Sequence, residues 1–136
     1  MTVNANQGDV MTVLGPVPSD NLGITLMHEH LFNDIRLLFK PGPDAPVQDL
    51  DRWQQKLILE NLHVAREAGP IADNYVLDNE LVAIEDLMEF GVSGGGTLVE
   101  LTPIGVGRDP LAIRRVSEAA GVNVVMGTGW YREMCH

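Results

Sequence analysis

The fold class follows from residues 94–129, which read GGGTLVELTPIGVGRDPLAIRRVSEAAGVNVVMGTG. Thr97–Thr102 and Val122–Met126 are short apolar runs typical of buried strands. Asp109–Pro110 favours a helix start, because Asp caps the first amides and Pro has no N–H to leave unbonded there. Gly121 supplies the helix stop. A strand, a helix and a strand predict a βαβ unit, with parallel strands in a sheet covered by helices.

Two further amphipathic helices are predicted on the N-terminal side of this unit. One begins near residues 78–79 and stops at Gly91. The other is capped by the aspartate at position 49 or 51, repeats its apolar residues at spacings of three and four, and ends at Gly69–Pro70. Phe39–Gln48 contains three prolines and no periodicity, so it is expected to be a surface loop.

The N-terminal region predicts two more strands. Met11–Leu14 and Gly23–Met27 are apolar runs, and the turn-rich stretch Gly15–Asn21 separates them. A short N-terminal hairpin is one arrangement of these runs. Strands and helices then alternate until the chain stops after its third core strand, so we expect an α/β fold that is interrupted at its C-terminal side.

Composition limits the functions that this chain can have. Nine basic against nineteen acidic residues among 136 give a net charge of −10, which disfavours binding to nucleic acid and to anionic membranes. The length suits one domain. No apolar run spans a bilayer and the first basic residue is Arg36, so a cytoplasmic location is the default expectation. Cys135 is the only cysteine, which excludes an internal disulfide.

The clearest chemical signal is His28-Glu29-His30, at the end of the strand predicted over Gly23–Met27. Residues at i and i+2 of a strand point to the same side, so the two imidazoles can chelate one metal ion. At the carboxyl end of a parallel strand they would face the edge where α/β folds place their sites. A pair of hydrogen-bonded structural histidines remains the alternative.

Five segments place these histidines in a wider context, in the same order and spacing as in one known family. They are Thr12–Val17, Leu22–His30, Gly95–Thr102, Gly105–Pro110 and Gly127–Tyr131. Together they resemble the phosphotriesterase family, with its phosphotriesterase-related and lactonase-like members, within the amidohydrolase superfamily. The resemblance covers nearly the whole chain.

The resemblance implies a (β/α)₈ TIM barrel with a binuclear divalent metal centre, usually zinc, in which His28 and His30 ligate one metal. The other ligands of the family come from later strands that residues 1–136 do not contain. A complete barrel needs about 250 residues. The chain is therefore expected to be the N-terminal part of a barrel domain, truncated at its C-terminal side and inactive alone.

The resemblance also implies a reaction. The family hydrolyses small-molecule esters, lactones or phosphotriesters with a metal-bridged hydroxide, and the full-length enzyme would be a homodimer. Tyr131 falls where lactonase-like members tend to carry tyrosine, so it is a candidate for substrate binding. An amphipathic tyrosine that only lines the barrel mouth is the alternative.

Other readings of the chain remain open. An amidohydrolase of another kind, acting on amides or cyclic amides, would share the HxH pair, although Gly95–Pro110 argue against it. A non-catalytic fragment would bind metal weakly, because zinc sites generally need three or four protein ligands. Arg108 is expected to tie down its loop. Glu100 faces either the barrel interior or the helix layer, and it receives no role.

Overall fold

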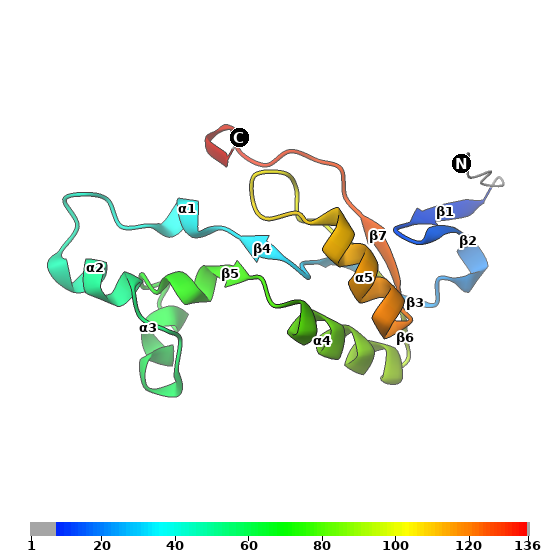
Figure 1. Cartoon of the computed structure of the whole chain (residues 1–136), viewed down its shortest axis with the longest axis horizontal. Helices are drawn as coiled ribbons and strands as arrows, with labels where there is room; N and C mark the ends of the chain where they lie inside the picture. Colours follow the sequence, from blue (N-terminus) through cyan, green and yellow to red (C-terminus); the bar gives the residue numbers. More distant parts are fainter. Residues whose placement is uncertain (1–7, 136) are drawn as a thin grey trace. The chain divides into compact units, whose positions relative to one another are not determined.

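The computed structural model describes residues 8–135, which divide into two compact units (Figure 1). One unit combines the described residues up to Phe32 with those from Asn79 onward, and the other is Asn33–Asp78. The prediction of one partial barrel domain over residues 1–136 stays a prediction. Within residues 8–135, no helix has the length and apolar character needed to cross a bilayer.

The first unit is built on a three-stranded parallel sheet with the order β3-β6-β7. The strands are β3 (Ile24–Glu29), β6 (Gly95–Glu100) and β7 (Asn123–Met126). Glu29 of β3 lies opposite Glu100 of β6, which in turn lies opposite Met126 of β7. The carboxyl ends of all three strands therefore meet at one edge, and the predicted α/β class is confirmed.

Two helices connect these strands, as the sequence predicts. α4 (Glu80–Val92) begins after Asn79, whose side chain accepts hydrogen bonds from the first backbone amides of the helix. α5 (Pro110–Ala120) begins in the same way after Asp109 and ends at Gly121, whose φ of 68° is left-handed. Glycine adopts that conformation without steric cost, so it ends the helix cleanly.

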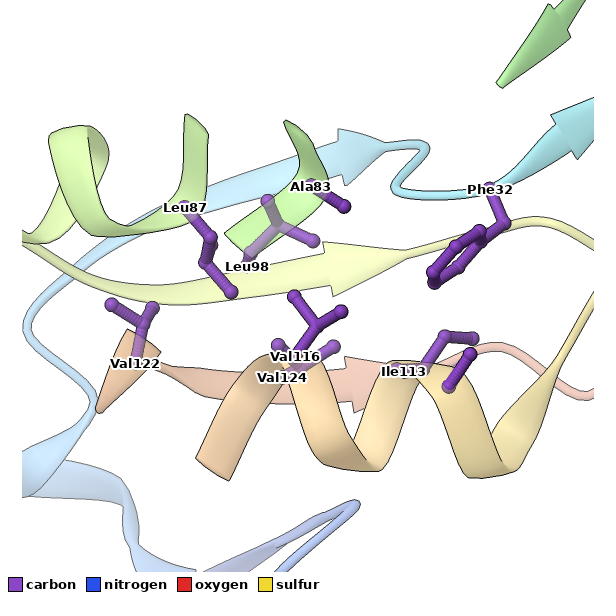
Figure 2. Close-up of a cluster of buried hydrophobic side chains, with 9 residues drawn as sticks. Phe32, Ala83, Leu87, Leu98, Ile113, Val116, Val122 and Val124 are labelled. Carbon is purple, nitrogen blue, oxygen red and sulfur yellow. The ribbon is translucent and has the colours of Figure 1, made fainter. Parts of the chain in front are cut away.

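The core lies between the sheet and these two helices (Figure 2). Leu98 of β6 and Val124 of β7 face Leu87 of α4 and both Ile113 and Val116 of α5. Each fully buried side chain of this size stabilises the fold by about 1.5–3 kcal/mol. The two helices thus cover one face of the sheet and fix the positions of the strand ends.

A glycine allows β3 and β6 to approach each other at their starts. A Cβ atom on Gly96 would lie 2.3 Å from the carbonyl oxygen of Leu22, closer than any real contact. The next residue, Thr97, donates its hydroxyl hydrogen to that same oxygen at 2.6 Å. The close approach therefore explains the glycine at position 96, the second residue of β6.

The N-terminal hairpin forms, but with a different second strand from the one predicted. β1 (Asp9–Thr12) pairs antiparallel with β2 (Gly15–Pro18), which lies inside the stretch predicted as a turn, and β3 pairs with β6 instead. The turn is closed by a 2.6 Å hydrogen bond from the Thr12 hydroxyl to the Gly15 carbonyl. The prolines of β2 are tolerated because an edge strand does not need every N–H.

The second unit consists of short elements rather than the long helix predicted to end at Gly69–Pro70. Its elements are β4 (Asn33–Asp34), α1 (Arg36–Phe39), α2 (Val47–Trp53), η2 (Leu59–Asn61), α3 (Leu62–Arg66), η3 (Ala72–Tyr75) and β5 (Val76–Leu77). β4 and β5 form a small antiparallel ladder. The ring of Phe39 stacks on that of Tyr75, with centroids 4.2 Å apart.

Side chains explain why the long helix breaks between α2 and η2. Asn61 accepts a hydrogen bond from the Ile58 amide at 2.9 Å and donates one to the Lys56 carbonyl at 2.9 Å. Asp73 accepts from the Leu57 amide at 3.0 Å. These bonds give the backbone partners outside a helix, so the apolar periodicity across this segment does not produce one.

Candidate metal centre

The two histidines predicted as ligands lie together at the carboxyl end of β3. His28 belongs to the strand and His30 follows it directly. Their rings pack edge to face, with centroids 5.5 Å apart and planes at 74°. Both residues are exposed in this chain. The strand thus presents two imidazoles at the edge of the sheet where α/β folds bind ligands.

His30 is anchored to the neighbouring strand. Its Nδ1 lies 2.8 Å from the hydroxyl oxygen of Thr102, a fully buried residue that follows β6. The backbone supports the same junction, because the Leu101 amide donates to the Glu29 carbonyl at 3.0 Å. The position of His30 is therefore tied to β6 as well as to its own strand.

Glu100 is the neighbour of Thr102 on the side of β6, and its side chain is fully buried. Its carboxyl group meets both the amide of Thr102, at 3.1 Å, and the Thr102 hydroxyl. Burial raises the pKa of the Glu100 carboxyl, while the bonds from Thr102 and the nearby His30 act in the opposite direction. Glu100 is thus a buried carboxyl group whose hydrogen-bond partner is Thr102.

Thr102 and Glu100 are the site residues that the sequence reasoning missed. Thr102 was assigned only to a strand pattern, and Glu100 received no role. A usable signal did exist, since polar residues at the end of the strand next to an HxH strand must lie close to the histidines when the strands are parallel.

The donor set fits a divalent metal such as zinc. Two imidazoles on one tetrahedral zinc, with Zn–N distances of about 2.0–2.1 Å, place their ring centres roughly 5 Å apart. The observed 5.5 Å between His28 and His30 is close to that spacing. Within residues 8–135, no third His, Cys, Asp or Glu joins them in a group that could hold the ion.

The third predicted site residue, Tyr131, lies in the loop after β7 and is 42% exposed. Within the described range, its ring contact is with the guanidinium of Arg132, 5.8 Å from the ring centroid, and not with either histidine. Next to it, Trp130 bridges to Ile104, so the loops after β6 and β7 run side by side. Arg108 ties these loops together through a 3.1 Å bond to the Gly127 carbonyl, as predicted.

Known proteins match this chain along almost its entire length. The human N-acetyltaurine hydrolase is 37% identical over 131 residues, which cover 95% of this chain and 37% of that protein. A solved structure of a resiniferatoxin-binding protein from Rhodobacter sphaeroides is 38% identical with a TM-score of 0.84, over 95% of this chain and 36% of that one. The solved structure of the phosphotriesterase from Mycobacterium tuberculosis is 31% identical with a TM-score of 0.56, over 91% of this chain and 30% of that one.

The chain therefore spans little more than a third of the length of the curated relatives it matches. The sequence model of the phosphotriesterase family matches residues 8–136. This match confirms the resemblance drawn from the sequence motifs. The chain belongs to the phosphotriesterase family.

Proposed function

We propose that this chain contributes the first two metal ligands, His28 and His30, to a metal-dependent hydrolase. The observation that carries the proposal is the pair of imidazoles 5.5 Å apart at the carboxyl end of β3. Members of the family are binuclear metal enzymes, and zinc suits imidazole donors. The remaining ligands would come from parts of the barrel outside these residues.

A divalent metal held there would supply Lewis-acid polarisation of the scissile group. The chain's own part is to bind and orient. β3 places both imidazoles on one side, and the contact with Thr102 holds the ring of His30. Neither histidine is assigned as a general base in this scheme.

The substrate we propose first is a small N-acyl amide of the N-acetyltaurine kind. The support is the 37% identity to the human N-acetyltaurine hydrolase over 95% of this chain. This choice reverses the order suggested by the sequence motifs, which put esters, lactones and phosphotriesters first. Those substrates are the second candidate, supported by the 31% identity to the phosphotriesterase of Mycobacterium tuberculosis.

Tyr131 is proposed as a residue that contacts the substrate. Its exposed ring and the adjacent Arg132 suit a polar, anionic group better than an apolar one. No nucleic acid or membrane partner is proposed, and the complete enzyme is proposed to be a cytoplasmic homodimer acting on a small molecule.

A chimaera tests the reaction. Residues 8–135 replace the matching 37% of the human N-acetyltaurine hydrolase, and the product is assayed with N-acetyltaurine, a γ-lactone and a phosphotriester. We expect zinc-dependent release of taurine. A folded, zinc-loaded chimaera that hydrolyses only the lactone or phosphotriester would support the second candidate instead.

Matched variants test the ligands. In the chimaera, His28→Ala or His30→Ala should each abolish turnover and lower the zinc content, because a ligand is lost. His63→Ala is the control, since His63 is an exposed histidine on α3, and it should change neither. Full turnover in the His28→Ala and His30→Ala variants would contradict the proposal.

The substrate contact proposed for Tyr131 is tested separately. Tyr131→Phe in the chimaera should raise KM more than it lowers kcat.

A further inference from the structure

Thr102 makes three polar contacts through one hydroxyl group. Its oxygen lies 2.8 Å from Nδ1 of His30, 2.5 Å from the carbonyl oxygen of Phe32, and within hydrogen-bond distance of Oε1 of Glu100. The side chain is fully buried, so water does not compete for these contacts. The hydrogen atoms in this cluster can therefore be counted.

A hydroxyl group carries one hydrogen and can accept through two lone pairs. The Thr102 hydroxyl can donate to the Phe32 carbonyl or to the Glu100 carboxyl, and its one hydrogen serves one of these two oxygens at a time. If that hydrogen pointed at His30 instead, the Thr102 oxygen would face the oxygens of Phe32 and Glu100 without offering a hydrogen to either of them. Turning it toward either of those oxygens leaves only lone pairs for His30. In every acceptable arrangement, Nδ1 of His30 is the donor.

We propose that Thr102 is a positioning residue that fixes the tautomer of His30, by accepting a hydrogen bond from Nδ1–H so that Nε2 keeps its lone pair for a divalent cation. A ligating histidine is oriented in this way by the bond that its second nitrogen makes. The role of the cation rests on the proposed function. The tautomer is a property of this chain without any metal.

His28 provides an internal comparison. Its contact among the described residues is with the ring of His30, and no buried hydroxyl group is bonded to it. Thr102 therefore preorganises one ligand of the pair and leaves the other to adjust. His63, exposed on α3, serves as a second reference histidine.

The test is the nitrogen NMR spectrum of the metal-free chain, labelled with ¹⁵N and recorded at a pH where histidines are neutral. We expect His30 to show a protonated Nδ1 and an unprotonated Nε2. His28 and His63 should instead show the mixture of the two neutral tautomers that an unconstrained imidazole has. Thr102→Val should shift His30 toward that mixture, and Thr102→Ser should restore the wild-type pattern. A wild-type His30 that carries its proton on Nε2 would overturn the proposal, even if the valine variant does not fold.

Zinc titration of the chimaera, in which the rest of the barrel is present, separates this inference from the proposed function. We expect zinc to bind about 10–100-fold more weakly to Thr102→Val than to the wild type, with Thr102→Ser close to the wild type. Zinc binding that depends on both histidines but not on Thr102 would overturn the positioning role and leave the proposed function intact. If neither the chimaera nor its Thr102 variants bind zinc while the tautomer is as expected, the proposed function fails and the positioning of His30 stands.

Discussion

At the scale of single residues, Glu100 makes the stability of the chain depend on pH. Burial raises the pKa of its carboxyl above the ordinary value of 4.5. The folded chain then keeps a proton that the unfolded chain has already lost. The contribution of Glu100 to the free energy of unfolding is fully present below pH 4.5 and is lost as the pH rises through the higher pKa of the folded state.

Glu100→Gln should remove this dependence, because glutamine has the shape of the protonated acid and does not titrate. We expect the free energy of unfolding of the variant, relative to the wild type, to increase from pH 4 to pH 8 in urea titrations followed by circular dichroism. Glu29→Gln is the matched control, since Glu29 lies opposite Glu100 in the register but is exposed. Parallel profiles for wild type and Glu100→Gln would contradict the expectation.

The same scale shows what the sequence reveals about the site. His28 and His30 could be predicted because their spacing alone puts them on one side of a strand. Thr102 was missed, because its contact with His30 joins residues 72 positions apart and its signal lies in the pairing of two strands instead of local spacing. Pairing between parallel strands creates that contact, and the local pattern of apolar residues does not predict which strands pair.

At the scale of elements, the caps of α4 and α5 carry a measurable share of stability. The Asp109 carboxylate accepts from the amides of Leu111 and Ala112 at 3.0 and 2.9 Å. Asp109→Ala should lower the free energy of unfolding by about 0.5–2 kcal/mol, because these amides lose their partner. Glu118→Ala is the control, because it removes the same charge from an exposed position on α5. It should change the free energy of unfolding by less than about 0.5 kcal/mol.

The urea midpoints of Asp109→Ala and Glu118→Ala show whether the Asp109 cap stabilises the chain beyond the effect of its charge. If Asp109→Ala matched Glu118→Ala, the cap would contribute nothing beyond its charge. Asp109→Asn should retain most of the wild-type stability, because asparagine caps as well as aspartate.

Helices with such caps were predicted correctly, whereas the long helix of the second unit was not. In α5 the cap, Pro110 and Gly121 agree with the apolar pattern, so each local signal favours the same structure. Between α2 and η2 the apolar pattern has no support from its polar residues. Asn61 and Asp73 bond to the backbone there, and Asp73 reaches its partner from outside the predicted helix.

At the scale of the whole molecule, alternation of strands and helices was enough to predict a parallel α/β sheet. It was not enough to predict the compact unit Asn33–Asp78, whose elements are too short to show a period. The solved structures that this chain matches are about three times as long as the chain, and the parallel sheet of β3, β6 and β7 is consistent with one part of an eight-stranded barrel.

In a closed barrel every strand has two neighbours, but β3 is an edge of the sheet among the described residues. Ile24 and Met27 on this strand are 66% and 70% exposed. An exposed apolar edge with unpaired N–H and C=O groups is a template for pairing with another chain. We therefore expect the isolated chain to self-associate as its concentration rises, measured by sedimentation velocity.

Two lysine variants distinguish pairing at the strand edge from non-specific association through exposed apolar surface. Met27→Lys places a charge on the edge strand and should shift the chain toward monomer, since charged edges resist strand addition. Leu111→Lys, at a residue that is also 70% exposed but lies on α5, should leave association unchanged. If both variants became equally monomeric, association would reflect exposed apolar area alone. If the wild type stayed monomeric at every concentration, β3 would not behave as an open sheet edge.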